Sequence, residues 1–351
     1  ALQHLDRQPY LDWKRSRVVT ALSMEGIDTP VEPVLAVGAH TRRRATFSAL
    51  RVKGSPLLLG FRKAQSHDLI NIGECPVLLP RIEASLPGLR RLLDDLLPAG
   101  EARILVTVCD NGLDLNIETA ANPLRPLTPA VARAAEALGI VRITLGDDPL
   151  LTTATPKVTC GGVPVDLPPS AFLQASAEAE AAMAAIAVDA IGKARKVADL
   201  FCGVGAFSFA LARKAAVTAA EIDRRLIAAL ERAARHAQGL KPIRTLVRDL
   251  MREPLSPPEL RDFDAVLFDP PRAGAIAQGR ALAKSEVAVV IAVSCNPASF
   301  AKDARALIDG GYTLGRVVPV DQFTYSPHVE LVAVFERAAK RRKSRNFRAE
   351  P

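Results

Sequence analysis

The chain has few cysteines and no long hydrophobic run. Its 351 residues include five cysteines, and their odd number and wide spacing argue against a disulfide framework and predict a reducing cytoplasm. No apolar stretch approaches the roughly 18–20 residues that span a bilayer, and no signal peptide opens the sequence, so we expect no membrane partner. With 49% hydrophobic residues, the chain is long enough for two domains with a substantial core.

Acidic residues are outnumbered by basic ones. The net charge of +8 suits a polyanionic partner, and the run Arg42-Arg43-Arg44 and the tail KRRKSRNFR would supply phosphate contacts. A solvated basic surface explains the same charge equally well. Charge alone therefore leaves an RNA partner open.

The pattern of apolar residues predicts an N-terminal helical segment (1–28) and a middle α+β domain (29–165). Hairpins are expected at Asp110-Asn111-Gly112 and at Gly161-Gly162. After Pro168-Pro169 strands alternate with helices, which indicates an α/β domain over 166–338 with a Rossmann-like, doubly wound parallel sheet. Residues 339–351 form a basic tail that we expect to be disordered.

A glycine-containing turn, DLFCGVGAF, lies between the first strand and helix of this sheet. Gly203 and Gly205 would let backbone N–H groups approach a ligand, but the third glycine of a dinucleotide fingerprint is replaced by Ser208. Glu221 ends the next strand, where a carboxylate can accept from ribose hydroxyls, although Asp223 competes for that role. Asp249 follows the third strand. Together they favour S-adenosylmethionine over a dinucleotide.

Two further strand ends carry reactive groups. Asp269 precedes Pro270-Pro271, which stiffen the turn, and Arg272 follows. The apolar run from Val287 to Val293 predicts a strand covered on both faces, and Cys295 lies just beyond it. Its thiol is a candidate nucleophile, while the competing interpretation is a small core residue.

The segments DLFCGVGAFSF, FDPPRAG, SCNPASFAKD and DQFTYSPHVELVAVF, in this order, resemble the RNA uracil-5-methyltransferases. FRKAQSHDLINIGECPVL in the middle domain also fits, and the resemblance extends from about Leu2 to Phe335. The branch that methylates 23S ribosomal RNA is more similar than the transfer-RNA branch. The expected product is 5-methyluridine in RNA.

This resemblance implies roles for individual residues. Cys295 would add to C6 of a uridine, and Glu330 would remove the C5 proton; without the motif, Glu330 would be interpreted as an exposed strand residue. Phe172, Asp269 and Arg272 would contact the flipped base. The methyl-donor contacts would be Gln174, Phe201, Gly203, Gly205, Glu221, Asp249 and Asp269.

The chain departs from the family pattern at several positions. Ala206 stands where the family usually has Asn in the glycine turn, and Ala175 or Ser176 replaces the Asn after Gln174. Many relatives bind a [4Fe–4S] cluster through four cysteines. Cys75 matches the fourth, and the other three have no counterpart. Because the sequence begins at Ala1, we expect a truncated form whose intact chain would carry the cluster and an N-terminal RNA-binding barrel.

Other functions remain as alternatives. A transfer-RNA uridine methyltransferase and a non-catalytic RNA-binding protein both fit the fold and the charge. A cytosine-C5 or small-molecule methyltransferase is disfavoured by the SCNP loop together with the HVE glutamate. A nicotinamide oxidoreductase is disfavoured by the missing third glycine. We expect a cytoplasmic monomer.

Overall fold

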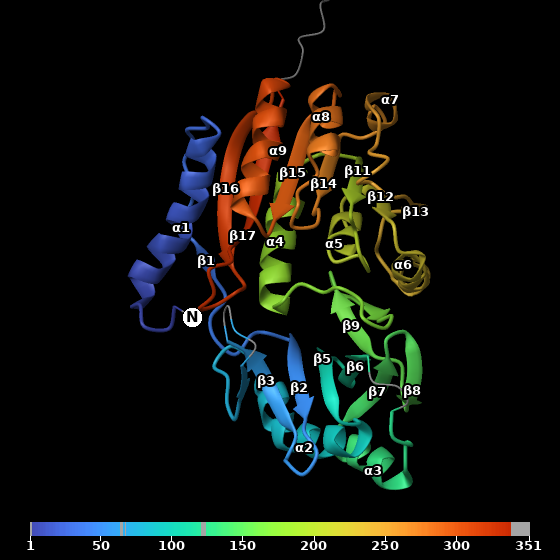
Figure 1. Cartoon of the computed structure of the whole chain (residues 1–351). Helices are drawn as coiled ribbons and strands as arrows, with labels where there is room; N and C mark the ends of the chain where they lie inside the picture. Colours follow the sequence, from blue (N-terminus) through green and yellow to red (C-terminus); the bar gives the residue numbers. More distant parts are fainter. Residues whose placement is uncertain (1, 64–65, 67, 121–123, 338–351) are drawn as a thin grey trace, which may run out of the picture.

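The computed structural model describes residues 2–63, 66, 68–120 and 124–337. The predicted basic tail, 339–351, lies outside these residues. Within them the chain forms two large β-sheets, one built mainly from the first half of the sequence and the other mainly from the second half (Figure 1). No described helix combines the length and the apolar character needed to cross a membrane.

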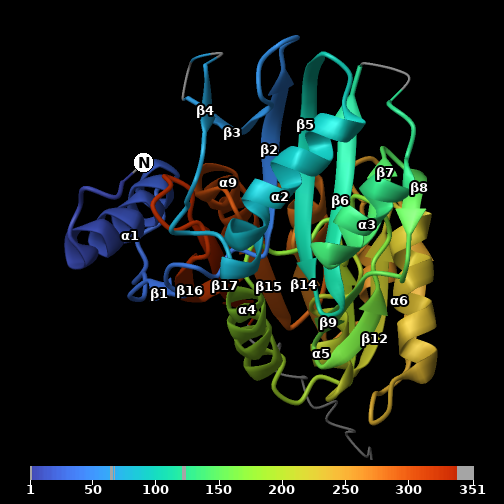
Figure 2. The same ribbon diagram turned by 90° about the horizontal axis from the view of Figure 1, so that it is seen from below.

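The first sheet has the strand order β4-β3-β2-β5-β6-β7-β8, with neighbours antiparallel except β6 and β7. Helices α2 and α3 cover one face, as Figure 2 shows, and the leucines of α2 pack on it together with Val131 and Ala135 of α3. The predicted turn at Asp110-Asn111 is confirmed, since Cys109 pairs with Gly112. The elements are β2 (Arg44–Arg51), β3 (Leu58–Arg62), β4 (Leu69–Asn71), α2 (Pro80–Leu96), β5 (Gly100–Cys109), β6 (Gly112–Thr119), α3 (Pro129–Ala137), β7 (Ile140–Leu145) and β8 (Asp148–Thr152).

The second sheet has the order β1-β16-β17-β15-β14-β11-β12-β13. The strands from β15 to β13 are parallel, as predicted, but β17 runs antiparallel to both β15 and β16. The last two strands form a hairpin rather than a further βα unit, because no helix separates them. The strands are β1 (Leu35–Ala36), β11 (Lys196–Leu200), β12 (Ala216–Glu221), β13 (Ile243–Val247), β14 (Ala265–Phe268), β15 (Val289–Ser294), β16 (Thr313–Asp321) and β17 (Glu330–Glu336).

Helices cover both faces of this sheet, as the strand composition requires. Alternate residues of β15 enter two different cores: Ile291 and Val293 lie in one, Val290 and Ala292 in the other. Helices α4, α5 and α6 contribute to the first core, and α1, α8 and α9 to the second. The helices are α1 (Arg7–Met24), α4 (Ala177–Ala190), α5 (Ser208–Ala212), α6 (Arg224–His236), α7 (Pro257–Leu260), α8 (Ile276–Ala283) and α9 (Pro297–Asp309).

Two short segments from the first half of the chain join the second sheet or its core. Strand β1 pairs with β16, and the hairpin of β9 (Lys157–Cys160) and β10 (Val163–Asp166) packs against α6. The predicted turn at Gly161-Gly162 is confirmed. The expected domain boundaries near residues 29 and 165 stay a prediction, and both contacts cross the one near residue 165.

Candidate functional site

The carboxyl ends of the parallel strands meet at one edge of the second sheet. Leu200 of β11 pairs with Phe268 of β14, which in turn pairs with Ala292 of β15. The residues that follow these strands, Phe201, Asp269 and Cys295, therefore emerge side by side. The backbone N–H of Asp269 donates to the Leu200 carbonyl at 3.2 Å, which holds the Asp-Pro-Pro turn against the glycine turn.

Cys295 and Glu330 are brought together by the antiparallel pairing of β15 and β17. Ser294, the last residue of β15, lies opposite Leu331, and extending this register by one residue sets Cys295 opposite Glu330. Facing residues in an antiparallel pair have Cα atoms about 4.5–5.5 Å apart. The predicted nucleophile and base are thus neighbours, although they are 35 positions apart in the sequence.

The thiol of Cys295 is partly exposed, just before the Asn296 cap of α9. Desolvation raises its pKa to about 11, and the nearby carboxyls of Glu330 and Asp269 add to this effect, while Arg272 opposes it. Asn296 Nδ2 donates to the Arg272 carbonyl at 3.1 Å, so the two loops are joined. At neutral pH the thiol is therefore protonated in the free protein, and it must lose its proton to act as a nucleophile.

Glu330 is 2% exposed and begins β17. Its pKa is raised above the usual range, first by burial and then by the charge of Asp269, while a hydrogen bond from Gln322 lowers it. Gln322 Nε2 donates to Glu330 Oε2 at 2.7 Å. A carboxyl with a raised pKa beside a partly exposed thiol is the arrangement expected of a general base.

Asp269 is connected to Glu330 through two amide side chains. Gln174 Nε2 donates to Asp269 Oδ2 at 2.9 Å, and Gln322 Nε2 donates to Gln174 Oε1 at 2.8 Å. Burial raises the pKa of Asp269, and the charge of Asp199 acts in the same direction. Gln322 was not among the predicted site residues, although it lies in the DQF segment that carried part of the resemblance.

The glycine turn leaves room for a ligand at the end of β11. Phe201 and Gly203 have φ values of 64° and 56°, and a Cβ on Gly203 would meet nothing within 4 Å. Packing also requires a glycine at position 205, since a Cβ there would lie 2.6 Å from the Phe209 ring. Asp199 lies fully buried beneath the turn, and its Oδ1 has no hydrogen-bond partner among the described residues.

Glu221 is held against the same turn. Its Oε2 accepts from the Gly203 N–H at 3.2 Å, and its Oε1 accepts from the Ile222 N–H at 2.7 Å. Asp223, the competing residue, caps α6 and pairs with Arg225. We therefore favour Glu221 over Asp223 as the ligand contact.

Asp249 follows β13 at the same edge of the sheet. Its Oδ1 accepts from the Met251 N–H at 3.1 Å, and its carboxylate forms an ion pair with Arg252. The turn after β13 therefore holds Asp249 in place. The group at this edge, with an orphaned buried oxygen, a positive-φ turn and two carboxylates, fits a nucleoside-bearing methyl donor.

A second hollow lies next to the amide chain. It has a volume of about 250 Å³, and Gln174 and Gln322 line it together with two arginines and two aromatic rings. The Arg44 guanidinium lies 5.2 Å from the ring centroid of Phe172, which is 64% exposed, and that of Arg42 lies 5.9 Å from the ring of Phe323. Within the described residues neither arginine forms an ion pair, so both charges are available to an anion.

The substitutions noted in the sequence have local explanations. The Ser176 side chain caps α4 by accepting from the Ala179 N–H at 3.3 Å, so the residue after the Gln174 segment starts a helix. Ala206 packs on the core beneath the sheet. The Ala206 side chain therefore offers no polar group in the glycine turn in place of the family's Asn, and the Ser176 hydroxyl is used in capping α4.

Cys75 does not belong to a metal site in this structure. It is a free thiol, and its backbone N–H donates to Glu83 at 3.1 Å. Across the described ranges no group of three or more His, Cys, Asp or Glu side chains could hold a metal ion. The described residues therefore do not fit a [4Fe–4S] cluster, which needs about four thiolates.

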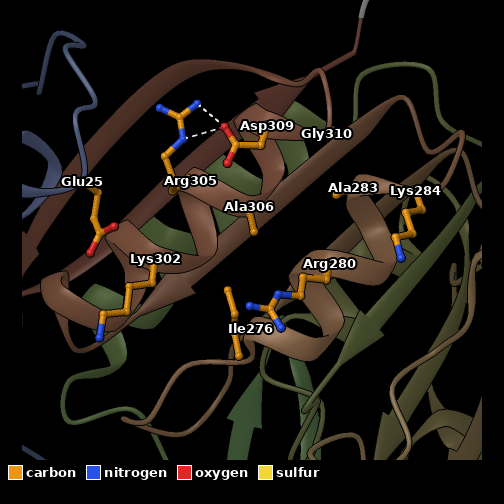
Figure 3. Close-up of a pocket in the computed structure, with 10 residues that line it drawn as sticks. All are labelled: Glu25, Ile276, Arg280, Ala283, Lys284, Lys302, Arg305, Ala306, Asp309 and Gly310. Carbon is orange, nitrogen blue, oxygen red and sulfur yellow. Dashed lines mark hydrogen bonds and ion pairs between the residues drawn. The ribbon is translucent and has the colours of Figure 1, made fainter.

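A larger cavity, of about 610 Å³, lies between α8 and α9 (Figure 3). Arg280 of α8 and Lys284, which caps the end of α8, line it on one side, and Lys302 and Arg305 line it from α9. Arg305 pairs with Asp309, whereas the other three cations form no ion pair within the described part of the chain. This cavity includes none of the predicted site residues.

Known RNA methyltransferases are similar to this protein along almost the whole chain. An uncharacterized RNA methyltransferase of Brucella suis is 48% identical over 342 residues, which cover 96% of this chain and 81% of that protein. The 23S rRNA (uracil(1939)-C(5))-methyltransferase RlmD of Aeromonas hydrophila is 31% identical over 95% of this chain and 79% of its own length.

The fold is also found in a solved structure. The tRNA (uracil-54, C5)-methyltransferase of Pyrococcus abyssi, crystallised with S-adenosyl-L-homocysteine, superposes with a TM-score of 0.75. It shares 22% identity, and the match covers 95% of this chain and 84% of that one. A model of the tRNA (Uracil-5-)-methyltransferase family matches residues 165–338. The expected Rossmann-like methyltransferase fold is thereby confirmed, and the chain belongs to the RNA uracil-5-methyltransferase family.

Proposed function

We propose that this enzyme methylates C5 of a uridine in 23S ribosomal RNA, with S-adenosylmethionine as methyl donor and Cys295 as covalent nucleophile. The observation that supports the proposal is the pairing of Ser294 with Leu331, from which we infer that the thiol of Cys295 lies beside the buried Glu330 carboxyl. A non-catalytic RNA-binding protein would have no need for these two groups at adjoining strand ends.

The methyl donor would bind at the edge formed by the glycine turn. Glu221 would accept from the ribose hydroxyls, Asp249 would face the adenine, and Asp269 would lie towards the reacting end. Bound there, S-adenosylmethionine supplies an electrophilic methyl group on a sulfonium centre. The open space beside Gly203 and the unpartnered Asp199 Oδ1 support this position.

The chain's own residues would carry the remaining chemistry. Cys295 Sγ, after losing its proton to solvent, adds to C6 of the uracil, which makes C5 nucleophilic. Once C5 has taken the methyl group, Glu330 removes the C5 proton, the C6–S bond breaks, and the thiolate leaves with the double bond restored. The Asp269 carboxyl and the Gln174 amide border the same space and would orient the ring.

The target uridine would enter through the hollow next to Gln174. Phe172 offers an exposed ring for stacking a base, and Arg42 and Arg44 offer guanidinium groups for phosphates. Arg272 would contact the substrate from the turn after β14. The target must leave its stack to reach Cys295.

The choice of 23S rRNA follows the name of the Aeromonas relative, and the Pyrococcus structure keeps transfer RNA as the second candidate. We further propose that the enzyme acts as a monomer in the cytoplasm. The odd number and wide spacing of the five cysteines motivate the proposal of a reducing compartment.

RNA containing 5-fluorouridine tests the proposal, because fluorine at C5 cannot leave as a proton and the covalent adduct persists. The parent protein should form a denaturation-resistant complex with a 23S fragment in the presence of S-adenosylmethionine. Cys295→Ser should form none while still binding the RNA, and Cys75→Ser, which changes a partly exposed thiol outside the site, should match the parent. An adduct that survives Cys295→Ser would refute the assignment, and trapping by tRNA alone would change the substrate.

A further inference from the structure

Gln322 is a buried amide that lies between the two carboxyls of the site. It follows β16 directly and is 3% exposed. Its Nε2 donates to Glu330 Oε2 and to Gln174 Oε1, and its Oε1 accepts from the Ala175 backbone N–H at 3.0 Å. The three hydrogen bonds of the Gln322 amide are thus all made to residues in or next to the site.

The contacts determine the orientation of the whole chain of amides. A backbone N–H can only donate, so the atom of Gln322 that faces Ala175 must be the oxygen. The nitrogen then faces both Glu330 and Gln174, which makes Gln174 Oε1 an acceptor and leaves Gln174 Nε2 to donate to Asp269. Each carboxyl at the ends of the chain therefore receives a donated hydrogen bond.

This orientation matters most for Glu330. Among the described residues, Gln322 provides the one side-chain donor to the Glu330 carboxyl. A donated hydrogen bond stabilises the ionised form of a buried acid more than its neutral form. A general base must be ionised before it can take a proton, so the same bond that orients Glu330 also keeps it ready to act.

We propose that Gln322 is a positioning residue for proton removal, whose amide holds Glu330 as a proton acceptor and connects it through Gln174 to Asp269. The inference rests on the proposed function and goes beyond it, because it explains how a buried base stays usable. Gln322 touches neither of the reacting atoms assigned above and acts through Glu330.

Several charged groups surround Glu330 and set the background for this effect. Asp269 lies beyond β14, and Cys295 lies beyond β15 with Arg272 near it. On the β16 side Asp321 is already paired with Lys14. The Asp269 charge opposes ionisation of Glu330, so the Gln322 hydrogen bond acts against both burial and a like charge.

The test is the pH dependence of resolution of the methylated covalent adduct in single-turnover experiments. The rate should rise with pH as Glu330 ionises. Gln322→Met keeps the approximate size of the side chain and removes the hydrogen-bond donor. The pKa of Glu330 should rise, and the acid limb of the pH–rate profile, its rising part at low pH, should move about 1–2 pH units higher. At pH 7 the adduct should resolve about 10–100-fold more slowly and accumulate, with recovery at high pH.

A second variant protects the test from simple misfolding. Gln322→Glu retains an acceptor for the Ala175 N–H but replaces the donor with an acid, so the limb should move in the same direction. Gln278→Met is the matched control, because Gln278 is a buried amide that bonds Leu255 N and O away from the site. Its acid limb should coincide with that of the parent.

Two results separate this inference from the proposed function. If both Gln322 variants form the adduct and resolve it with the parental pH profile, the positioning role is wrong while the methyltransferase mechanism stands. If the parent itself forms no adduct, the proposed function fails first. A shift seen in both Gln322 variants and absent from Gln278→Met supports the inference.

Discussion

Glu330→Gln is the substitution that tests the proposed chemistry most directly. The side chain is 2% exposed and lies in a hydrogen-bonded setting that an amide of equal size can occupy. The new oxygen can still accept from Gln322, so the substitution removes the proton acceptor with little change of shape. Because the carboxyl is buried, solvent bases are poor replacements for it.

The expected magnitude follows from the role of a positioned base. Proton transfer by such a group contributes about 10²–10⁴-fold, so turnover should fall by that factor, which corresponds to about 3–5 kcal/mol in the barrier. Formation of the C6–S bond and methyl transfer precede proton removal and should persist. A methylated RNA–protein adduct should therefore accumulate.

Rapid quenching with tritiated methyl donor and a denaturing gel measures both quantities. Glu336→Gln, at the exposed far end of the same strand, is the control and should leave turnover unchanged. Turnover within tenfold of the parent would remove Glu330 from the role of base. Loss of turnover without any labelled adduct would place its action before methyl transfer and contradict the order of steps.

Two further predictions concern stability and RNA binding. Arg43→Met should destabilise the protein by about 3–5 kcal/mol in urea unfolding, because it leaves the buried Glu180 carboxylate without its 2.6 Å partner. An accompanying Glu180→Leu should restore much of the lost stability. A loss of stability below about 1 kcal/mol in Arg43→Met would contradict the reasoning. Arg280→Glu, in the cavity between α8 and α9, should weaken RNA binding and reduce the salt slope by about 1. Arg235→Glu, also exposed on a helix, should have the smaller effect, and equal effects would exclude a specific RNA contact in that cavity.

The strand that leads to Cys295 was predictable because it is apolar on both faces. That pattern arises when a strand is covered on each side, and alternate residues of β15 do enter separate cores. The same pattern could not reveal that Glu330 faces Cys295. Their proximity depends on β17 running antiparallel to β15 in one particular register, and a sequence of repeated βα units favours a further parallel strand.

Gln322 was missed for a different reason. An amide carries no charge and follows no hydrophobic period, so its role appears only when its partners are known. Those partners come from three segments: Gln174 and Ala175 before α4, Asp269 through Gln174, and Glu330 at the start of the next strand. A residue whose function is to connect other residues leaves little signal in a single sequence.

The N-terminal helix was predictable as a helix, but its contacts near the site were not. Its buried face has the spacing Tyr10, Lys14, Val18, Leu22, so the period predicted the helix even though one of these four positions holds a lysine. Burial lowers the pKa of that lysine, and pairing with Asp321 opposes the shift. Its ammonium group lies 3.0 Å from the Phe323 carbonyl and 2.6 Å from the His328 carbonyl.

These contacts attach α1 to the segment between β16 and β17. The Tyr10 hydroxyl adds a bond to Asp321 Oδ2 at 2.8 Å and accepts from the Tyr325 N–H at 2.9 Å. The segment runs from Gln322 to the residue before Glu330 and has little regular structure of its own, so the positions of both residues depend on how this loop is held. A buried cation that binds two loop carbonyls and a carboxylate restrains such a loop where no strand pairing can. The first helix, more than 300 residues away in sequence, therefore supports the geometry on which the proposed proton removal depends.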